Sequence, residues 1–444
     1  MVNMHRRRTL WTLLIFLTGQ ARAQTPVTTI HTFGGPPDGA NPSAGVVAGR
    51  DGVLYGTTAN GGLKPSSDPY ATNGCGIVFS LTPTATPGGT WTELILHSFT
   101  GGSDGCGPTS GVVIGRNGVL FGTTSNGLQG GTAFSLTPPE VAGGAWTETV
   151  IHTFIGGYTD GAAALFGVVI GRGGVLYGSS FYGGSYCQGT GAAGCGTVYG
   201  LTPPAPPGGP WTETLLYSIG ALDDGPAAGL AIDRTGVLYG TTRYGGGPYG
   251  GPGTVFSLTP PASADGSWMQ AVLSNFTTSG GTDNGSTPVT PVSIGPDGTL
   301  YGTTSSGGSG GGGEVYSLTP PASPGGAWTY TVLWNFSSNK GDPLGGSPEQ
   351  LTLTRSGAIF TASAGGGSLR AGTILALTPP AAAGGAWTAS LVHTFEGADG
   401  IAPNGGLLAA PGGVLYGTTY GRQPMEAGGG PRYGTVYMLR LQSQ

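Results

Sequence analysis

The chain has 444 residues, of which 92 are Gly and 35 are Pro, and only 8% are charged. This glycine and proline content alone would suggest a disordered chain. However, short runs of Val, Leu, Ile, Tyr, Phe, Trp and Thr lie between the glycines and predict strands that bury a core. The formal charge of −5 gives no basic surface for nucleic acid, so we expect no nucleic-acid partner.

The N-terminus has the pattern of a signal peptide. Basic residues from His5 to Arg8 precede an apolar run, Leu10 to Leu17, and Ala21-Arg22-Ala23 supplies a cleavage site. The alternative, a membrane anchor, needs about 20 apolar residues, and no later segment is long enough either. We therefore expect residues 1–23 to be removed, no membrane span afterwards, and a secreted protein, extracellular or periplasmic. The mature charge is −9, because four of the 16 Lys and Arg residues lie in the signal peptide.

Residues 24–444 repeat one unit. Segments of the type Gly-Val-Leu-Tyr-Gly-Thr-Thr begin at seven positions, 56 to 66 residues apart, which suits one four-stranded propeller blade per unit. These positions are Gly52, Gly118, Gly174, Gly236, Gly298, Gly357 and Gly413.

The second unit shows the strands of one blade. An apolar strand A (111–115) leads through an Asn117-Gly118 turn into strand B (119–124). Strand C (132–137) ends at two prolines, and the alternating segment 146–154 is strand D.

The two ends of the repeat complete each other. Residues 28–33 form a D strand with no A, B or C strand before it, and residues 434–439 form a C strand with no D strand behind it. The sequence therefore predicts an all-β, seven-bladed β-propeller with four antiparallel strands per blade, closed by the N-terminal strand in the last blade. An open β-solenoid would not need this arrangement.

The repeats resemble the GloVer tandem repeats of choice-of-anchor exported bacterial proteins. The resemblance rests on Leu54-Tyr55-Gly56-Thr57-Thr58 and on the segment 253–261, and it extends over residues 27–440. It implies an exported repeat module and carries no catalytic residues. Weaker kelch-like features are a Gly-Gly after strand B and a Trp at the start of strand D. Because the sequence stops at Gln444 directly after a C strand, we expect no sorting tail.

The predicted topology places the B–C and D–A loops on one face, which we name the loop face. These loops vary most between units, and variable loops on a regular scaffold are the usual place for binding. The candidate ligand-binding residues on this face are Tyr70, Tyr182, Tyr186, Tyr244, Tyr249, Arg422 and Tyr433. Tyrosine suits sugar rings and protein interfaces, although scattered surface tyrosines have the same pattern.

The four cysteines also lie on the loop face. We expect disulfides between Cys75 and Cys106 and between Cys187 and Cys195, because each pair shares neighbouring loops and exported chains form disulfides. Neither spacing is that of a redox motif.

Aspartates recur in the D–A loops at Asp38, Asp104, Asp160 and Asp399. A ring of carboxylates could hold Ca²⁺, but a repeated Asp-Gly turn, in which the side chain bonds its own backbone, explains the pattern better. The D-strand histidines are interpreted as packing residues, because a metal site would not place its ligands on the outer strands of different blades. We therefore assign no metal and no cofactor.

No catalytic motif occurs in a fitting context. The leading hypothesis is a non-catalytic binding or scaffold module for a glycan or an extracellular protein. The alternative is a glycan-cleaving enzyme, a hydrolase or lyase, that uses Asp104, Asp160 or Glu349 at the channel mouth. A third possibility is a matrix element that assembles with neighbouring chains, and the sequence fixes no oligomeric state.

Overall fold

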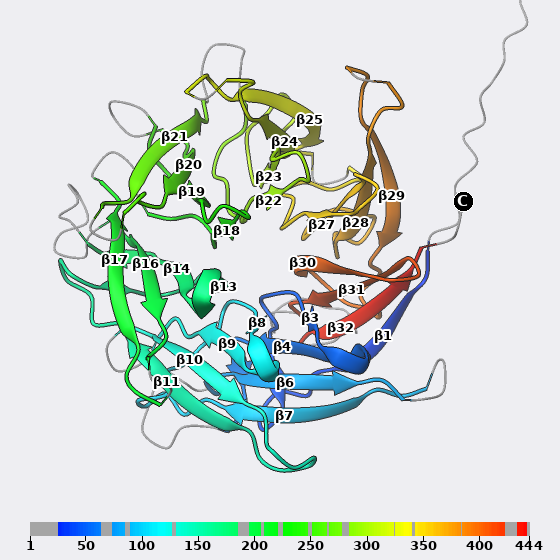
Figure 1. Cartoon of the computed structure of the whole chain (residues 1–444). Coiled ribbons are helices and arrows are strands. Elements are labelled where there is room, and N and C mark those ends of the chain that lie inside the picture. Colours follow the sequence, from blue (N-terminus) through cyan, green and yellow to red (C-terminus); the bar gives the residue numbers. More distant parts are fainter. Residues whose placement is uncertain are drawn as a thin grey trace, which may run out of the picture.

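The protein is described from a computed structural model. It describes residues 25–63, 73–84, 89–126, 130–184, 195–205, 208–220, 225–246, 251–263, 266–277, 284–323, 325–339, 342–382, 384–421 and 433–441. These residues form seven antiparallel four-stranded sheets around a central channel (Figure 1). The predicted seven-bladed β-propeller is confirmed.

Each blade places its short A strand at the channel and its long D strand outside. The A strands are β3 (Val47–Ala48), β8 (Val113–Ile114), β13 (Val168–Ile170), β18 (Ala231–Ile232), β22 (Ser293–Ile294), β26 (Thr352–Leu353) and β30 (Pro403–Ala410). The B strands are β4 (Leu54–Thr58), β9 (Leu120–Thr123), β14 (Leu176–Ser180), β19 (Leu238–Thr242), β23 (Leu300–Thr304), β27 (Ile359–Ser363) and β31 (Val414–Thr419). The C strands are β6 (Ile77–Thr82), β10 (Thr132–Thr137), β16 (Thr197–Thr202), β20 (Thr254–Thr259), β24 (Gly311–Thr319), β28 (Thr373–Thr378) and β32 (Thr435–Arg440). The D strands are β7 (Thr92–Ser98), β11 (Thr147–Thr153), β17 (Thr212–Ser218), β21 (Met269–Asn275), β25 (Thr329–Ser337), β29 (Thr388–Thr394) and β1 (Val27–Thr32).

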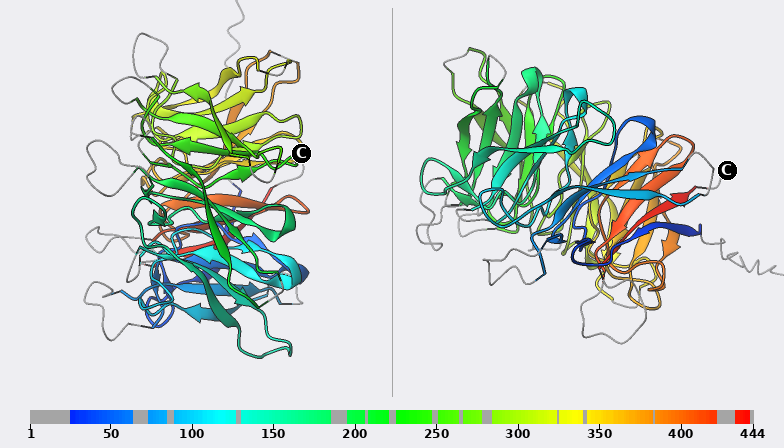
Figure 2. Two further views of the ribbon diagram at one scale, coloured as in Figure 1. Left: turned by 60° about the vertical axis from the view of Figure 1, so that its left-hand side comes forward. Right: turned by 90° about the horizontal axis from the view of Figure 1, so that it is seen from below.

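The first strand closes the ring. β1 pairs antiparallel with β32, so blade 7 has the order β1-β32-β31-β30. Figure 2 shows blue β1 lying beside red β32. The predicted closure is confirmed, and it leaves no open gap between the first and last blades.

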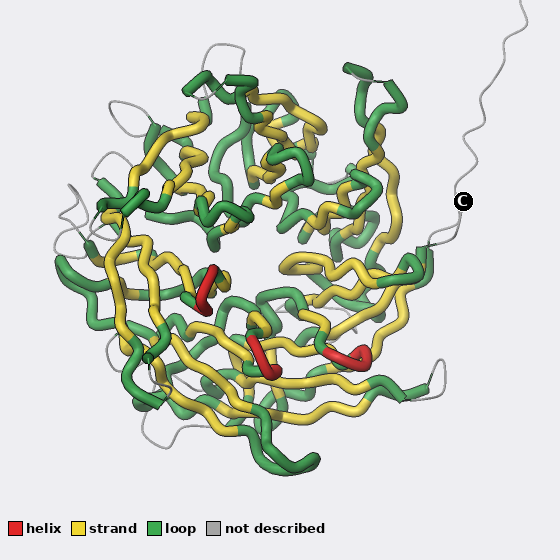
Figure 3. The backbone as a smooth tube through the Cα atoms, in the orientation of Figure 1, coloured by secondary structure: helices red, strands yellow, loops and turns green. Residues whose placement is uncertain are grey.

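Tight turns join strands A and B. In blades 1 to 3 they are the 3₁₀ turns η1 (Arg50–Gly52), η2 (Arg116–Gly118) and η3 (Arg172–Gly174), red in Figure 3. In η2, Asn117 and Gly118 have φ values of 58° and 78°. These positive φ angles are the reason for the Asn-Gly pair in the sequence. Two small ladders on the loop face, β2 (Gly39–Ala40) with β5 (Asn60–Gly61) and β12 (Gly161–Ala162) with β15 (Tyr182–Gly183), hold D–A loops against B–C loops.

The glycine inside the repeated Leu-Tyr-Gly-Thr-Thr segment makes room for an aromatic ring. A Cβ atom on Gly56 would lie 2.5 Å from the ring of Phe79, its partner on strand C. Blade 6 is the exception, because Thr361 replaces the glycine and Leu375 replaces the aromatic residue opposite it. The two positions therefore change together for a steric reason.

The core lies mainly between blades. In one cluster, Val78 and Phe99 of blade 1 pack with Leu120 and Phe134 of blade 2. The first threonine of the repeat adds a hydrogen bond across the same boundary, from Thr57 Oγ1 to the carbonyl oxygen of Ser110 at 2.8 Å. The boundary between consecutive blades is called a seam below, and seam 7/1 joins the last blade to the first.

The predicted disulfide between Cys75 and Cys106 is formed. Cys195 is also disulfide-bonded, whereas Cys187 lies outside the described residues. Within the described ranges, no helix is long and apolar enough to cross a membrane. The predicted signal peptide, residues 1–23, also lies outside the described part of the chain.

Candidate binding site at the channel mouth

A cavity of about 480 Å³ occupies the channel. Its lining consists of residues 43–47, 109–113, 165–169, 228–230, 289–292, 349–350, 352 and 404–408. These are the first residues of each A-strand segment and directly follow the D–A loops, whereas the A–B turns do not contribute. The cavity therefore opens on the loop face, as a propeller pocket of this kind should.

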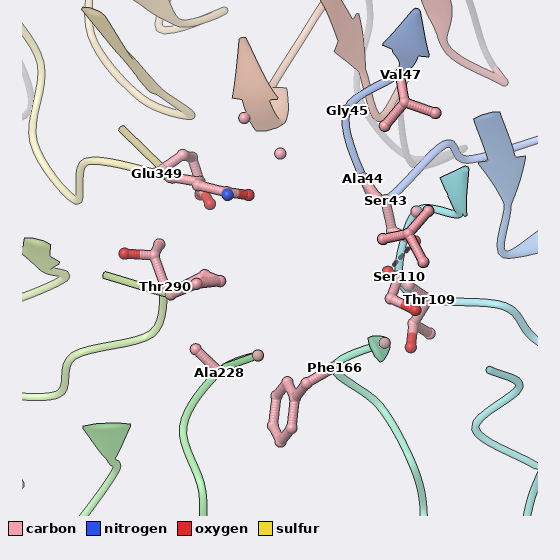
Figure 4. Close-up of a pocket in the computed structure, with 18 of the residues that line it drawn as sticks. Ser43, Ala44, Gly45, Val47, Thr109, Ser110, Phe166, Ala228, Thr290 and Glu349 are labelled. Atoms are coloured by element: carbon pink, nitrogen blue, oxygen red, sulfur yellow. Dashed lines mark hydrogen bonds between the residues drawn. The ribbon is translucent and has the colours of Figure 1, made fainter. Parts of the chain in front are cut away.

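The mouth of this cavity has two chemically different sides. The polar arc is formed by blades 6, 7, 1 and 2 and consists of Glu349, Gln350, Asn404, Ser43, Thr109 and Ser110. The apolar arc is formed by blades 3, 4 and 5 and consists of Leu165, Phe166, Ala228 and Val289. It also contains Thr290, whose hydroxyl is hydrogen-bonded to Thr303 Oγ1 at 2.7 Å. Figure 4 shows Glu349 at one end of the polar arc, across the cavity from Ser43, Thr109 and Ser110. Phe166 and Ala228 of the apolar arc lie along the edge of the cavity between them.

Hydrogen bonds between blades hold the mouth in place. Ser43 Oγ donates to the carbonyl oxygen of Thr109, and Thr109 Oγ1 donates to that of Leu165, each at 3.0 Å. The carbonyl oxygen of Glu349 accepts from Thr303 Oγ1 of blade 5 at 3.3 Å and from Thr361 Oγ1 of its own blade at 3.0 Å. The backbone that carries the lining side chains is thus fixed before any ligand arrives, which lowers the entropy cost of binding.

Glu349 is the electrostatically distinctive residue of the cavity. Burial raises its pKa to about 7, because a carboxylate is costly to desolvate. Within the described part of the chain, no side chain or backbone N–H group donates to its carboxylate. Glu349 can therefore both accept and donate a hydrogen bond near neutral pH, and a ligand can supply the missing partner.

Three of the predicted loop-face residues, Tyr182, Tyr244 and Tyr433, do not line this cavity. Tyr182 and Tyr244 are 42% and 44% exposed, Tyr182 contacts Phe181 edge to face, and the guanidinium of Arg243 lies 5.4 Å from the Tyr244 ring. Tyr433 is half-buried, and a Cβ atom on Gly35 would lie 2.7 Å from its ring. Tyr70, Tyr186, Tyr249 and Arg422 lie outside the described residues.

The D–A loop aspartates serve as turn residues. Asp38 accepts from the backbone N–H groups of Gly34 and Gly39, and Asp104 accepts from the N–H and the hydroxyl of Thr100. Asp160 and Asp399 accept from the backbone N–H groups of Ile155 and Glu396 in the same way. The prediction of a repeated Asp turn is confirmed.

Two expectations about charged residues need correction. Asp104 and Asp160 do not line the channel mouth, because their loops turn them toward the seams. Glu349 does line it. The D-strand histidines are also more than packing residues, because each one meets a carboxylate from the loop that follows it.

At three seams a glutamate from the next blade joins this pair. At seam 7/1, His31 Nε2 lies 3.8 Å from Asp38 Oδ2 and 3.5 Å from Glu93 Oε1. Burial, followed by the charge of Asp38 and a hydrogen bond to it, raises the pKa of Glu93 to about 8. The corresponding residues are His97, Asp104 and Glu148 at seam 1/2, and His152, Asp160 and Glu213 at seam 2/3.

The sequence contains a recurring pattern that marks these three glutamates. Each stands at the same place in a Trp-Thr-Glu segment, opposite a C-strand leucine. The tertiary structure was needed to show that this position faces the previous blade. Tyr330 holds the same position in blade 5, and its hydroxyl donates to the carbonyl oxygen of Asn284 at 2.8 Å.

The repeat assigns the chain to a family. A model of the Gloeobacter/Verrucomicrobia repeat matches residues 17–192 and 186–437. The chain belongs to this family. The GloVer resemblance of the sequence is thereby confirmed. Among curated proteins, none matches this GloVer repeat protein in sequence.

Solved structures share the GloVer repeat protein's propeller fold only distantly. A protein from Lactobacillus plantarum has 14% identity and a TM-score of 0.46, covering 79% of this chain and 84% of its own. The PQQ-bound aldose sugar dehydrogenase of Streptomyces coelicolor has 12% identity and a TM-score of 0.43, covering 94% and 99%. The NanB sialidase of Streptococcus pneumoniae has 11% identity and a TM-score of 0.44, covering 94% and 71%. At this level of similarity, the neighbours carry no argument about activity.

Proposed function

We propose that this protein is an exported, non-catalytic binding module that holds a glycan at the channel mouth. The supporting observation is the pairing of the polar and apolar arcs around one cavity. A sugar ring has hydroxyl groups at its edge and an apolar C–H face. The first suits Glu349, Gln350 and Asn404, and the second suits Phe166.

Export rests on two independent features. The residues 1–23 have the composition of a signal peptide, and the disulfide between Cys75 and Cys106 is of a kind that persists in oxidising compartments. A glycan is a partner that an exported protein meets at or beyond the cell surface.

A glycan array with the purified protein tests this function, followed by titration of the best ligand into variants. Phe166→Ala and Glu349→Ala should each weaken binding at least tenfold, because one loses the stacking face and the other loses both hydrogen-bonding oxygens in a desolvated site. Tyr182→Ala and Tyr244→Ala are the matched controls and should bind as the wild type does. No glycan binding, or binding lost only in the two tyrosine variants, would contradict the assignment to the cavity.

The cleavage alternative has less support. Glycoside hydrolysis generally uses two carboxyl groups about 5–9.5 Å apart, and Glu349 is the one carboxylate among the described residues that line the cavity. Incubation with the bound glycan should therefore leave the glycan intact. Products formed by the wild type and not by Glu349→Gln would instead show an enzyme.

A further inference from the structure

Three potential ligand atoms converge at seam 7/1. His31 Nε2, one oxygen of Asp38 and one oxygen of Glu93 all lie within 4.8 Å of one another. They come from three separate places: the closing strand β1, the D–A loop after it and strand β7 of blade 1. The ring closure of the propeller is what brings them together.

Within the described ranges, hydrogen bonds of the protein leave two of the three ligand atoms without a partner. His31 Nε2 and Glu93 Oε1 are shielded from solvent, and neither has a hydrogen-bond partner among the described residues. Two carboxylates face each other beside this imidazole. Buried polar groups without partners are costly, and a cation bound between these three groups would satisfy them.

We propose that seam 7/1 is a site for a divalent transition metal, with Zn²⁺ as the preferred ion. Zn²⁺ takes nitrogen and carboxylate ligands at about 2.0–2.2 Å, which corresponds to roughly 3.4 Å between the ligand atoms of a tetrahedron. The 3.5 and 3.8 Å separations from His31 Nε2 are close to this value. Ca²⁺ and Mg²⁺ fit less well, because they prefer oxygen ligands only.

The surroundings orient the ligands and leave an entry path. Backbone N–H groups of Gly34 and Gly39 fix the Asp38 carboxylate, and the ring of Phe33 meets that of His31 edge to face at 4.6 Å. The side chains of His31, Asp38 and Glu93 are 17%, 26% and 17% exposed. A water molecule can therefore complete the tetrahedron. A metal here ties the closing strand to blade 1.

Two other seams provide internal comparisons. Seam 2/3 has the same three residue types, but His152 Nε2 is already hydrogen-bonded to Asp160 Oδ1 at 3.2 Å, so we expect weaker binding there. At seam 6/7, Val27 holds the register position that Glu93 has in blade 1. There, His393 makes hydrogen bonds from both ring nitrogens, to Asp399 and to the carbonyl oxygen of Thr25.

Calorimetric titration of the chelator-treated protein with ZnCl₂ tests the site, with Co²⁺ absorption as a second readout of tetrahedral geometry. The wild type should bind one equivalent tightly and show the visible band of tetrahedral Co²⁺. Glu93→Gln and His31→Asn should each lower the Zn²⁺ affinity at least tenfold and remove that band. His393→Asn is the matched control and should bind as the wild type does.

Several outcomes would overturn the proposal. They are no binding of Zn²⁺ by the wild type, binding that both seam 7/1 variants retain, or a preference for Ca²⁺ over Zn²⁺. Thermal melting in chelator shows whether each variant is folded. Because Glu93→Gln keeps the size and shape of the side chain, it remains informative if His31→Asn does not fold.

Discussion

The channel mouth and seam 7/1 each contain a buried glutamate with a raised pKa, but the causes differ. Glu349 has a pKa of about 7 through burial alone, whereas Glu93 reaches about 8 through burial and the neighbouring Asp38. The first carboxyl group lacks a partner and lies in an open cavity. The second faces two other ligand atoms in a narrow space. A raised pKa therefore marks both sites, and only the neighbours show which kind of ligand each one fits.

The largest expected effect concerns Glu349 at the channel mouth and the pH dependence of stability. A carboxyl group whose pKa rises from 4.5 to about 7 on folding binds more protons in the folded state, so stability falls as the pH rises through this range. In the wild type, this group lowers the free energy of unfolding by up to about 3 kcal/mol as the pH rises, and Glu349→Gln should remove that decrease. Chemical denaturation of both proteins at pH 5 and pH 8 measures it, and parallel pH profiles would contradict it.

A second prediction concerns seam 6/7, where both ring nitrogens of His393 are hydrogen-bonded. Asp399→Ala at seam 6/7 should lower the free energy of unfolding by about 2–3 kcal/mol, because His393 Nε2 and the Glu396 N–H both lose their acceptor. Urea denaturation measures the change, with Glu140→Gln on an exposed loop as the control. A loss below about 0.5 kcal/mol would show that this pair is not structural.

The smallest expected effect concerns Glu93 at seam 7/1 and tests whether this residue has a structural role. Glu93→Val makes seam 7/1 resemble seam 6/7, where Val27 stands. In chelator, this variant should be within about 1 kcal/mol of the wild type, because replacing a buried polar group by an apolar residue of similar size is often neutral. A loss of several kcal/mol in urea denaturation would mean that Glu93 is a structural residue and not a metal ligand.

Much of the scaffold could be predicted from the sequence. The repeat intervals, the Asn117-Gly118 turn and the separate strands at the two ends were enough for seven blades and their closure, because turn chemistry and strand alternation are local properties. The disulfide between Cys75 and Cys106 followed from strand direction, which places both loops on one face, together with the signal peptide, which indicates an oxidising compartment. The candidate sites were less accessible, since Tyr182 and Tyr244 were singled out and the cavity turned out to be lined by Phe166 and its neighbours.

The sequence by itself determined the blade, its strand roles and the turn aspartates, because each depends on residues close together in the chain. Only the tertiary structure decided what meets across the channel and across the seams. Glu93 reaches His31, and Glu349 faces Ser43, because the packing of aromatic and aliphatic side chains sets how one blade is rotated against the next. That rotation has no signature within a single repeat.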